Sequence, residues 1–480
     1  MFLVGIFIAS ILLGCNNDSN KNNNNDETND KGIIEEGTDQ NPNIKAVDYD
    51  EYEFTFLTKS GISYNVRYIE PQGEEGNIFD DAVAKRNAVL EEKYNITIKQ
   101  YAVPDLVTEV RTQSLGGDLN FDAILANSAN LSTLARERLL YDLLSIERFD
   151  FSKSYWDQNA VKELVMGNKL YYTNCSLNTH SVGNAVFFNK KLVQDYNLTS
   201  PYEYINNNQW TLDNWSVMAK SISKDVNNDG VMTELDQYSQ ITTHGVQLMF
   251  LYGAGIRFTT NDETGFPKVS IVDNPDKLVN VYEKLKNIMS DTSISYCITC
   301  SNVDPHGYDH KWAYMRYLFT QDLYLFDYTT EGYMSILKDM ESEFGIIPFP
   351  KYDSSQESYK TYYPTDFNMF AIPAHIKNID RTANIIEDMN YYSSFILEPV
   401  WFDTLLARRY TRDNESEVTL RYIKENRVYD VGLYYNFGDF VTNVLSAQID
   451  RQNISREYQR YKNAIDNSIK GVFNDFSKRD

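Results

Sequence analysis

Histidine, cysteine and basic residues are scarce in this sequence of 480 residues. It has five His, four Cys and 45 Lys and Arg against 68 Asp and Glu, a formal net charge of −23. So acidic a chain repels phosphate backbones and anionic lipids, which disfavours nucleic acid and electrostatic membrane docking as partners. The motifs H-E-x-x-H, G-x-S-x-G and G-x-x-x-x-G-K-[ST] do not occur. We therefore expect a protein that is not an enzyme, although paired catalytic carboxylates leave no spacing signature in a sequence.

Long hydrophobic runs are also missing, apart from one at the N-terminus. The run from Phe2 to Leu13 is shorter than the roughly 20 residues that span a bilayer. It ends in Leu-Leu-Gly-Cys and a polar tract follows, which resembles the lipobox of bacterial lipoproteins, although no Lys or Arg precedes the run. We expect residues 1–15 to be a signal peptide and Cys15 to carry lipid on the extracellular face of the cell membrane. The alternative is a transmembrane anchor.

Beyond Cys15 the composition changes twice. Residues 16–47 are mostly Asn, Asp, Lys, Glu and Gly and cannot offset the entropy of ordering, so we expect a disordered tether. The rest of the chain is longer than a single hydrophobic core usually supports, which favours two lobes. Residues 51–58 alternate like a strand, 79–94 repeat apolar residues at helical spacing, and 95–101 alternate again. This order predicts a βαβ unit in an α/β fold.

Several segments resemble extracellular solute-binding proteins of family 1, the receptors of ABC importers. The matching segments are, in order, EEKYNITI, QSLGGDLNFDAIL, LARERLLYDLLSI, WDQNAVKELVMGNKLYY, AVFFNKKLV, PYEYINNNQWTLDNW, FGIIPFPKYD, FAIPAHIKN and YTRDNESEVTLRYIKENRVYDVG. Their shared order carries the resemblance, which covers residues 50–435. It implies a two-lobed type 2 periplasmic-binding-protein fold whose lobes are discontinuous and joined by hinge strands. We expect residues 48–187 and 343–378 in the N-terminal lobe, and 188–342 and 379–480 in the C-terminal lobe.

An acidic loop gives the strongest local motif. The segment DVNNDGVMTELD, residues 225–236, fits a calcium loop with oxygen ligands at its positions 1, 3, 5, 7 and 12. The ligands would be Asp225, Asn227, Asp229, the carbonyl of Val231, and Asp236. Gly230 would make the sharp turn at position 6. We expect a structural calcium ion; the alternative is a metal-free Asx-rich turn.

The cysteines and histidines permit a second metal hypothesis. Cys297 and Cys300 form a C-x-x-C, and His306 and His310 follow at a spacing too short for a Cys2His2 zinc site. A local disulfide, or two free thiols, is favoured over zinc. Cys175 is then left as a small buried residue.

The resemblance also implies a function and a set of ligand-binding residues. It predicts a receptor that captures a carbohydrate, most simply an oligosaccharide, between its lobes and delivers it to ABC permease subunits, acting as a monomer. The 36 Tyr and 25 Phe suit such a ligand, but an AT-rich genome would explain them as well. A peptide or other polar solute is the alternative ligand, and a surface glycan-binding protein or carbohydrate-active enzyme the alternative class. The candidate ligand-binding residues are Asn127, Ser128, Asn178, His180, Asp327, Tyr328, Asp366 and Trp401.

Overall fold

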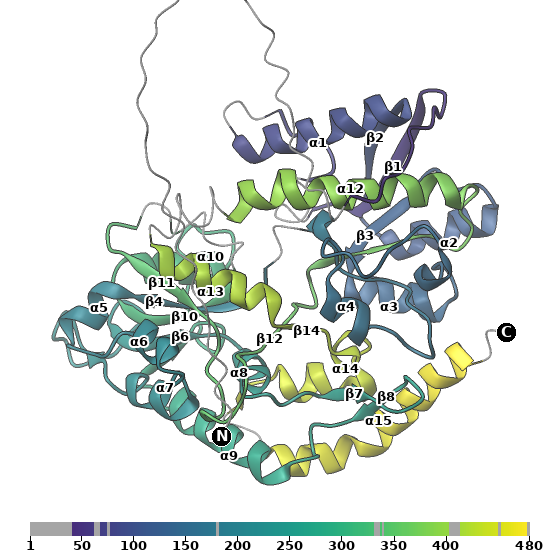
Figure 1. Cartoon of the computed structure of the whole chain (residues 1–480). Coiled ribbons are helices and arrows are strands. Elements are labelled where there is room, and N and C mark those ends of the chain that lie inside the picture. The colour runs from purple at the N-terminus through teal and green to yellow at the C-terminus, as the bar shows by residue number, and fades with distance from the viewer. Residues whose placement is uncertain are drawn as a thin grey trace, which may run out of the picture. The chain divides into compact units, whose positions relative to one another are not determined.

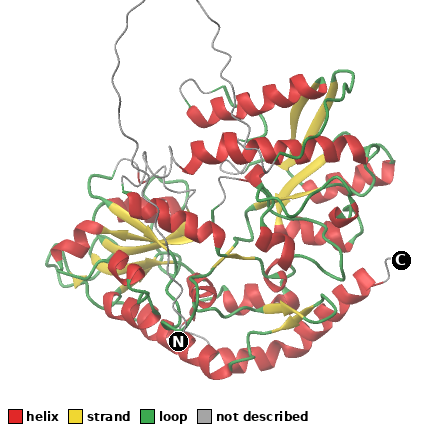
Figure 2. Ribbon diagram, in the orientation of Figure 1, coloured by secondary structure: helices red, strands yellow, loops and turns green. Residues whose placement is uncertain are grey.

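Helices and strands are interspersed along the chain in the computed structural model (Figures 1 and 2). It describes residues 41–61, 68–73, 77–178, 182–330, 337, 340–402, 413–449 and 453–477. The predicted signal peptide with Cys15, most of the predicted tether, and His180 lie outside these residues. No helix in the described ranges combines the length and the apolar character needed to cross a bilayer.

The strands form two larger sheets and two small ones. The strands are β1 (Tyr52–Lys59), β2 (Ile96–Val103), β3 (Ala123–Asn127), β4 (Asn184–Asn189), β5 (Ser223–Lys224), β6 (Gln237–Thr242), β7 (Thr259–Asn261), β8 (Pro267–Val269), β9 (Ser295–Cys297), β10 (Tyr324–Thr330), β11 (Phe344–Ile347), β12 (Thr361–Tyr362), β13 (Asn368–Ala371) and β14 (Arg427–Val428). The small sheets pair β12 with β14 and β7 with β8.

The α-helices are α1 (Ile78–Tyr94), α2 (Leu106–Gly116), α3 (Ser128–Arg136), α4 (Gln158–Glu163), α5 (Lys190–Asp195), α6 (Pro201–Asn206), α7 (Leu212–Met218), α8 (Val246–Gly253), α9 (Pro275–Met289), α10 (Lys311–Thr320), α12 (Ile379–Pro399), α13 (Asn414–Glu425), α14 (Val431–Tyr434) and α15 (Ile454–Ser477). Short 3-10 segments span Leu143–Ser145, Ser176–Asn178 and Phe437–Asp439, and a π-helical turn spans Val441–Leu445.

The first sheet has the strand order β13-β3-β1-β2. β1 pairs in parallel with both β2 and β3, and β13 runs antiparallel to β3. The predicted βαβ unit is confirmed as β1, α1 and β2. The side chain of Asn77 caps the start of α1 by accepting from the backbone N–H of Phe79, and Asn95, in a left-handed conformation, ends it. Buried Val83 and Leu90 lie seven residues apart on one face of α1.

The second sheet has the order β11-β4-β10-β6-β5, and β9 pairs with β6. β4 is buried along its whole length because it runs between β11 and β10, antiparallel to both. Its apolar side chains contribute to a core that includes Phe187, Tyr324 and Ile346. This core holds the sheet against α10 and α13, whose buried residues include Met315 and Leu420.

Strand pairing moves two of the predicted lobe boundaries. We expected residues 48–187 and 343–378 in one lobe, but β4 and β11, at the edges of those ranges, both belong to the second sheet. The chain leaves the first sheet before β4, and it returns to that sheet at β13. The predicted crossings therefore lie several residues from those observed, because hydrogen-bond pairing, which sequence spacing does not reveal, decides which sheet a strand joins.

Helix α12 corrects a third boundary. Residues 379–480 were expected in the second lobe, yet α12 lies alongside α1 (Figure 1). Tyr94 of α1 donates to Asp388 at 2.7 Å, and the buried guanidinium of Arg86 donates to Ser393 at 3.3 Å. Helix α13, further along the chain, instead packs against β11 of the second sheet. The C-terminal region is therefore divided between the two sheets.

Candidate functional site

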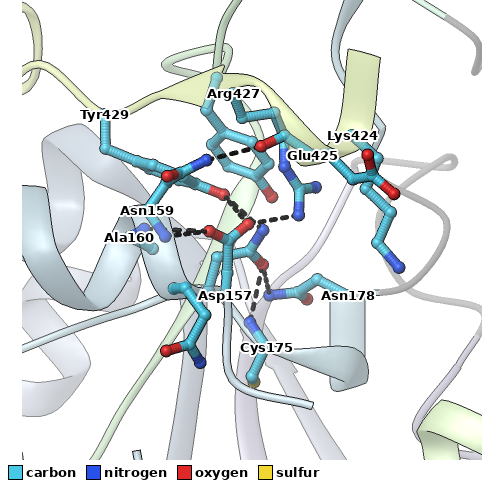
Figure 3. A network of polar contacts seen from close by, with 12 residues as sticks. Asp157, Asn159, Ala160, Cys175, Asn178, Lys424, Glu425, Arg427 and Tyr429 are labelled. Carbon is cyan, nitrogen blue, oxygen red and sulfur yellow. Dashed lines mark hydrogen bonds and ion pairs between the residues drawn. The ribbon is translucent and has the colours of Figure 1, made fainter. Parts of the chain in front are cut away.

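A buried polar network joins the segment around α4 to β14 (Figure 3). Asp157 is the N-cap of α4, and its side chain accepts from the backbone N–H groups of Asn159 and Ala160 at 3.0 Å each. The same carboxylate pairs with the guanidinium of Arg427 and accepts from the hydroxyl of Tyr429 at 2.8 Å. The side chains of Asp157 and Arg427 are only 7% and 5% exposed, so each charge depends on the other.

The network continues through two asparagines. Asn174 donates to the hydroxyl of Tyr429 at 2.8 Å, and its oxygen accepts from the side chain of Asn178 at 3.1 Å. The carboxamide oxygen of Asn178 has no hydrogen-bond partner in the described structure, although Asn178 is 1% exposed. Figure 3 shows Asn178 beside this network, on the short helical turn that follows Cys175.

Burial sets the electrostatics of the network. Desolvation would lower the pKa of Arg427, but the neighbouring Asp157 carboxylate raises it above its ordinary value. Burial raises the pKa of Tyr429 well above its usual range, although the charge of Arg427 opposes the rise. The guanidinium stays charged and the phenol neutral at every physiological pH. Arg427 and Tyr429 can therefore offer hydrogen bonds whose donors do not change with pH.

A second group of polar residues lies at the end of β3. Asn127 caps α3 by accepting from the N–H of Asn130 at 3.0 Å, and Ser128 donates to the carbonyl of Thr365 at 3.0 Å. Asn127 also lies opposite Asn368 in the ladder between β3 and β13. The structure thus brings three predicted residues, Asn127, Ser128 and the exposed Asp366, to one edge of the first sheet.

Tyr363 links the two groups. Its hydroxyl donates to the carbonyl of Asn368 at 2.9 Å, and its ring stacks on that of Tyr429 with 5.0 Å between centroids. The guanidinium of Arg427 lies over the same ring at 5.6 Å. The end of β3, the loop before β13 and the network around Asp157 therefore form one continuous polar region, which we call the candidate site.

Two of the predicted ligand-binding residues lie in a core instead. Asp327 and Tyr328 belong to the buried strand β10. Asp327 is fully buried, 3.3 Å from the guanidinium of Arg316, and burial raises its pKa although the nearby arginine opposes the rise. The hydroxyl of Tyr328 donates to Gln240 at 2.6 Å and accepts from the Trp215 indole at 3.0 Å. The two residues, expected to bind ligand, instead belong to a central strand and pack within the second sheet.

Trp401 lies apart from the candidate site. It follows α12, is half-buried, and its ring contacts Phe79 at the start of α1 with 5.5 Å between centroids. It also packs against the core of the second sheet, next to Phe402. Trp401 therefore packs between α1 and the core of the second sheet.

Sequence reasoning missed Asp157, Tyr363, Arg427 and Tyr429. One feature of the sequence pointed to Asp157. An Asp directly before a short helical pattern is typical of an N-cap residue. Nothing in the spacing indicates that its carboxylate pairs with a residue 270 positions away.

The predicted calcium loop folds as a series of tight turns. The Asp225 carboxylate accepts from the N–H groups of Asn228 and Gly230, both at 2.7 Å. Asn228 and Gly230 have φ of 60° and 82°, a region in which Gly is unstrained. The buried carboxylate of Asp236 accepts from the backbone N–H groups of Val226 and Thr233. Burial alone would raise the pKa of Asp236, but these two donors outweigh it, so the pKa lies below its usual value.

The loop supplies oxygen donors suited to calcium, but the carboxylate oxygens of Asp225, Asp229 and Asp236 do not all lie within 4.8 Å of one another. Among the described residues, the only set of three or more His, Cys, Asp and Glu ligand atoms within 4.8 Å of one another is His244, Cys297 and Cys300. The oxygens of Asp225, Asn227, Asp229 and Asp236 instead accept from N–H groups of their own loop.

The cysteine predictions are confirmed. Cys297 and Cys300 form a disulfide, and Cys175 is free and buried. His306 packs on Tyr314 with 5.2 Å between ring centroids, and the ring nitrogen of His310 caps α10 by accepting from Ala313 at 3.1 Å. Neither histidine joins the cysteines in the cluster described above.

Comparison with known proteins defines the fold class. No protein-family model and no curated protein matches the sequence. Solved structures do match. The ABC substrate-binding protein Lmo0181 from Listeria monocytogenes, in complex with cycloalternan, is 17% identical with a TM-score of 0.52, over 88% of this chain and 99% of that one. UspC from M. tuberculosis is 14% identical with a TM-score of 0.56, over 87% and 100%.

A third match is the ABC transporter associated binding protein from B. animalis subsp. lactis Bl-04, in complex with β-1,6-galactobiose. It is 12% identical with a TM-score of 0.53, over 87% of this chain and 97% of that one. The chain therefore has the two-lobed α/β fold of periplasmic-binding proteins, as predicted.

Proposed function

We propose that this protein is an extracellular, lipid-anchored substrate-binding protein of an ABC importer that captures a carbohydrate. The supporting observation is the fold: 87–88% of the chain superposes on substrate-binding proteins, two of which hold oligosaccharides. Capture needs two rigid bodies that close on a few hinge residues. The closed form then docks on separate ABC permease subunits in the membrane, and the protein acts as a monomer.

The candidate site is where we propose that the sugar binds. Asn127 and Asp366 supply a carboxamide and a carboxylate that can bind hydroxyl groups. Trp401, half-buried between α1 and the core of the second sheet, lies outside the candidate site, and we propose that it supplies an aromatic face for stacking when the lobes close. Arg427 and Asp157 neutralise each other, which suits an uncharged ligand better than an anion.

A thermal-shift panel on the full chain tests this proposal. It contains cycloalternan, maltotetraose, β-1,6-galactobiose, and tri- and tetrapeptides. A ligand that binds only the folded state, at about 100 times its Kd, adds about 2.7 kcal/mol to stability, so the expected result is a rise in Tm with one glycan class. Asp366→Ala and Asn127→Ala should weaken that shift, whereas Glu357→Ala, an exposed acid elsewhere, should not.

Peptides that shift the melt while glycans do not would leave a receptor and overturn the sugar assignment. Peptides and other polar solutes are the second candidate because the likeness at 12–17% identity concerns the fold. Turnover of a glycan in the same samples would favour a carbohydrate-active enzyme.

Two further parts of the proposal concern the membrane and the metal. Cys15 carries the lipid, so Cys15→Ser should release the protein from the membrane fraction of the producing cells. One calcium ion bound by Asp225, Asn227, Asp229, the carbonyl of Val231 and Asp236 tightens the exposed turn between β5 and β6.

A further inference from the structure

The second sheet brings a histidine to the Cys297–Cys300 pair. β6 runs parallel to β9 so that Thr242 lies opposite Cys297, and the N–H of Ile298 donates to Thr242 at 3.0 Å. His244 follows two residues beyond the end of β6. Its backbone N–H donates at 2.8 Å to the hydroxyl of Thr299, which lies between the two cysteines. Two paired strands therefore fix the histidine beside the C-x-x-C turn.

The potential ligand atoms of these three residues are close and accessible. A ring nitrogen of His244 and the two sulfurs lie within 4.8 Å of one another, and no other such group occurs in the described parts of the chain. In a tetrahedral zinc site, bond lengths of about 2.0–2.3 Å place ligand atoms about 3.5–3.8 Å apart. His244 and Cys300 are exposed and Cys297 is half-buried. All three line a pocket of about 380 Å³.

The turn does not depend on the disulfide for its shape. The carbonyl of Cys297 accepts from the N–H of Cys300 at 3.2 Å, and from the N–H and the hydroxyl of Ser301 at 3.1 and 2.8 Å. A disulfide that closes so short a loop also constrains the unfolded chain little. Reduction should therefore leave both sulfurs in place on a formed turn.

We propose that reduction of the Cys297–Cys300 disulfide creates a site for one Zn²⁺ ion, held by both thiolates and the neutral imidazole of His244, with the fourth position open to water. A dithiol reductant supplies two electrons and two protons, breaks the S–S bond and becomes a cyclic disulfide itself. The two thiols then release their protons to solvent as zinc binds. The site is separate from the candidate sugar site and does not depend on the proposed function.

Zinc binding by the full chain tests this inference. The protein is compared as isolated and after treatment with a phosphine reductant, in buffer saturated with calcium, by competition with a chromogenic zinc chelator. We expect one additional equivalent of Zn²⁺ only after reduction. Co²⁺ in place of zinc should give thiolate-to-metal charge-transfer absorption.

Variants separate this site from adventitious binding. His244→Ala should weaken binding at least about tenfold, because even outer-shell partners of a metal ligand change affinity about 10–100-fold. Cys297→Ser should abolish it, whereas His310→Ala, Cys175→Ser and Cys15→Ser should leave it unchanged. The inference is overturned if reduction adds no zinc, or if the His244 variant binds as tightly as the parent.

Discussion

The hydroxyl of Tyr155 donates to a carboxylate oxygen of Glu387 at 2.6 Å, joining the segment before α4 to the middle of α12. The same carboxylate accepts from the indole of Trp156 at 3.2 Å and from the backbone N–H of Asp150 at 3.1 Å. Glu387 is fully buried, and the structure gives it no cationic partner among the described residues. The side chain of Glu387 therefore holds α12 against the segment before α4 through three uncharged hydrogen-bond donors.

Burial makes Glu387 a source of pH-dependent stability. Desolvation raises the pKa of Glu387 from 4.5 to about 7, although its three donors oppose the rise. A raised folded-state pKa means that the folded protein binds this proton more tightly than the unfolded chain. The contribution of protonated Glu387 to folding stability is complete below about pH 4.5 and is lost as the pH rises to about 7. We expect the free energy of unfolding to fall over that window by up to about 3 kcal/mol from this group.

Urea denaturation between pH 4.5 and 7.5 measures this effect. Glu387→Gln does not titrate, so the difference between parent and variant should slope with pH even if the variant is less stable throughout. Glu415→Gln, at an exposed position of α13, should keep the parent's slope. If the free energies of unfolding of Glu387→Gln and the parent changed with pH in parallel, the carboxyl group of Glu387 would be ionised in the folded protein throughout this pH window.

Local patterns predicted the parts of the fold that local interactions determine. The alternation in β1, the helical period of α1 and the turns at 225–236 involve neighbours in sequence, and each was found where expected. The contact between the end of β3 and the loop of Asp366, through Ser128 and the carbonyl of Thr365, was not predicted because it joins residues far apart in the sequence. Asp327 and Tyr328 were chosen from the resemblance, and they lie in the core because β10 pairs with β4 and β6, which the sequence does not reveal. Asp157 and Arg427 meet only through the tertiary fold.

The buried pair of Asp157 and Arg427 predicts an asymmetric mutational response. Arg427→Met keeps the apolar bulk near Tyr363 but leaves a buried carboxylate without its cation, so we expect a loss of about 3–5 kcal/mol in the free energy of unfolding. Asp157→Asn combined with Arg427→Met removes both charges and retains a good N-cap residue for α4. The double variant should be more stable than Arg427→Met alone.

Chemical denaturation of the parent, both single variants and the double variant completes this thermodynamic cycle. Asp157→Asn alone leaves the guanidinium buried without its carboxylate and should also be costly. Additive losses would mean that the two charges do not interact, and that the network contributes hydrogen bonds alone.

Calcium removal should act through the 225–236 loop. If the ion binds only the folded protein, a calcium-specific chelator lowers Tm, and restored calcium reverses the change. Asp225→Ala with Asp229→Ala should abolish this response. That variant also loses acceptors for Gly230 and Val231, so the diagnostic quantity is the chelator-induced change in Tm rather than Tm itself.

Asp262→Ala provides the matched control, because Asp262 accepts from Thr264 in an exposed turn outside the loop. It should retain the full chelator response. A parent protein whose Tm does not move on chelation would identify residues 225–236 as a metal-free Asx turn.

The core position of Tyr328 predicts that stability and ligand affinity respond to different residues. Tyr328→Phe removes the partner of Gln240 and of the Trp215 indole, and each buried group left unsatisfied costs about 1–3 kcal/mol. Tyr328 is 3% exposed, so a sugar bound at the candidate site should retain its Kd. Trp401→Ala should instead weaken binding of a stacked sugar. Calorimetric titration and urea denaturation of both variants separate the two roles, and a weaker Kd with unchanged stability for Tyr328→Phe would return this tyrosine to the ligand site.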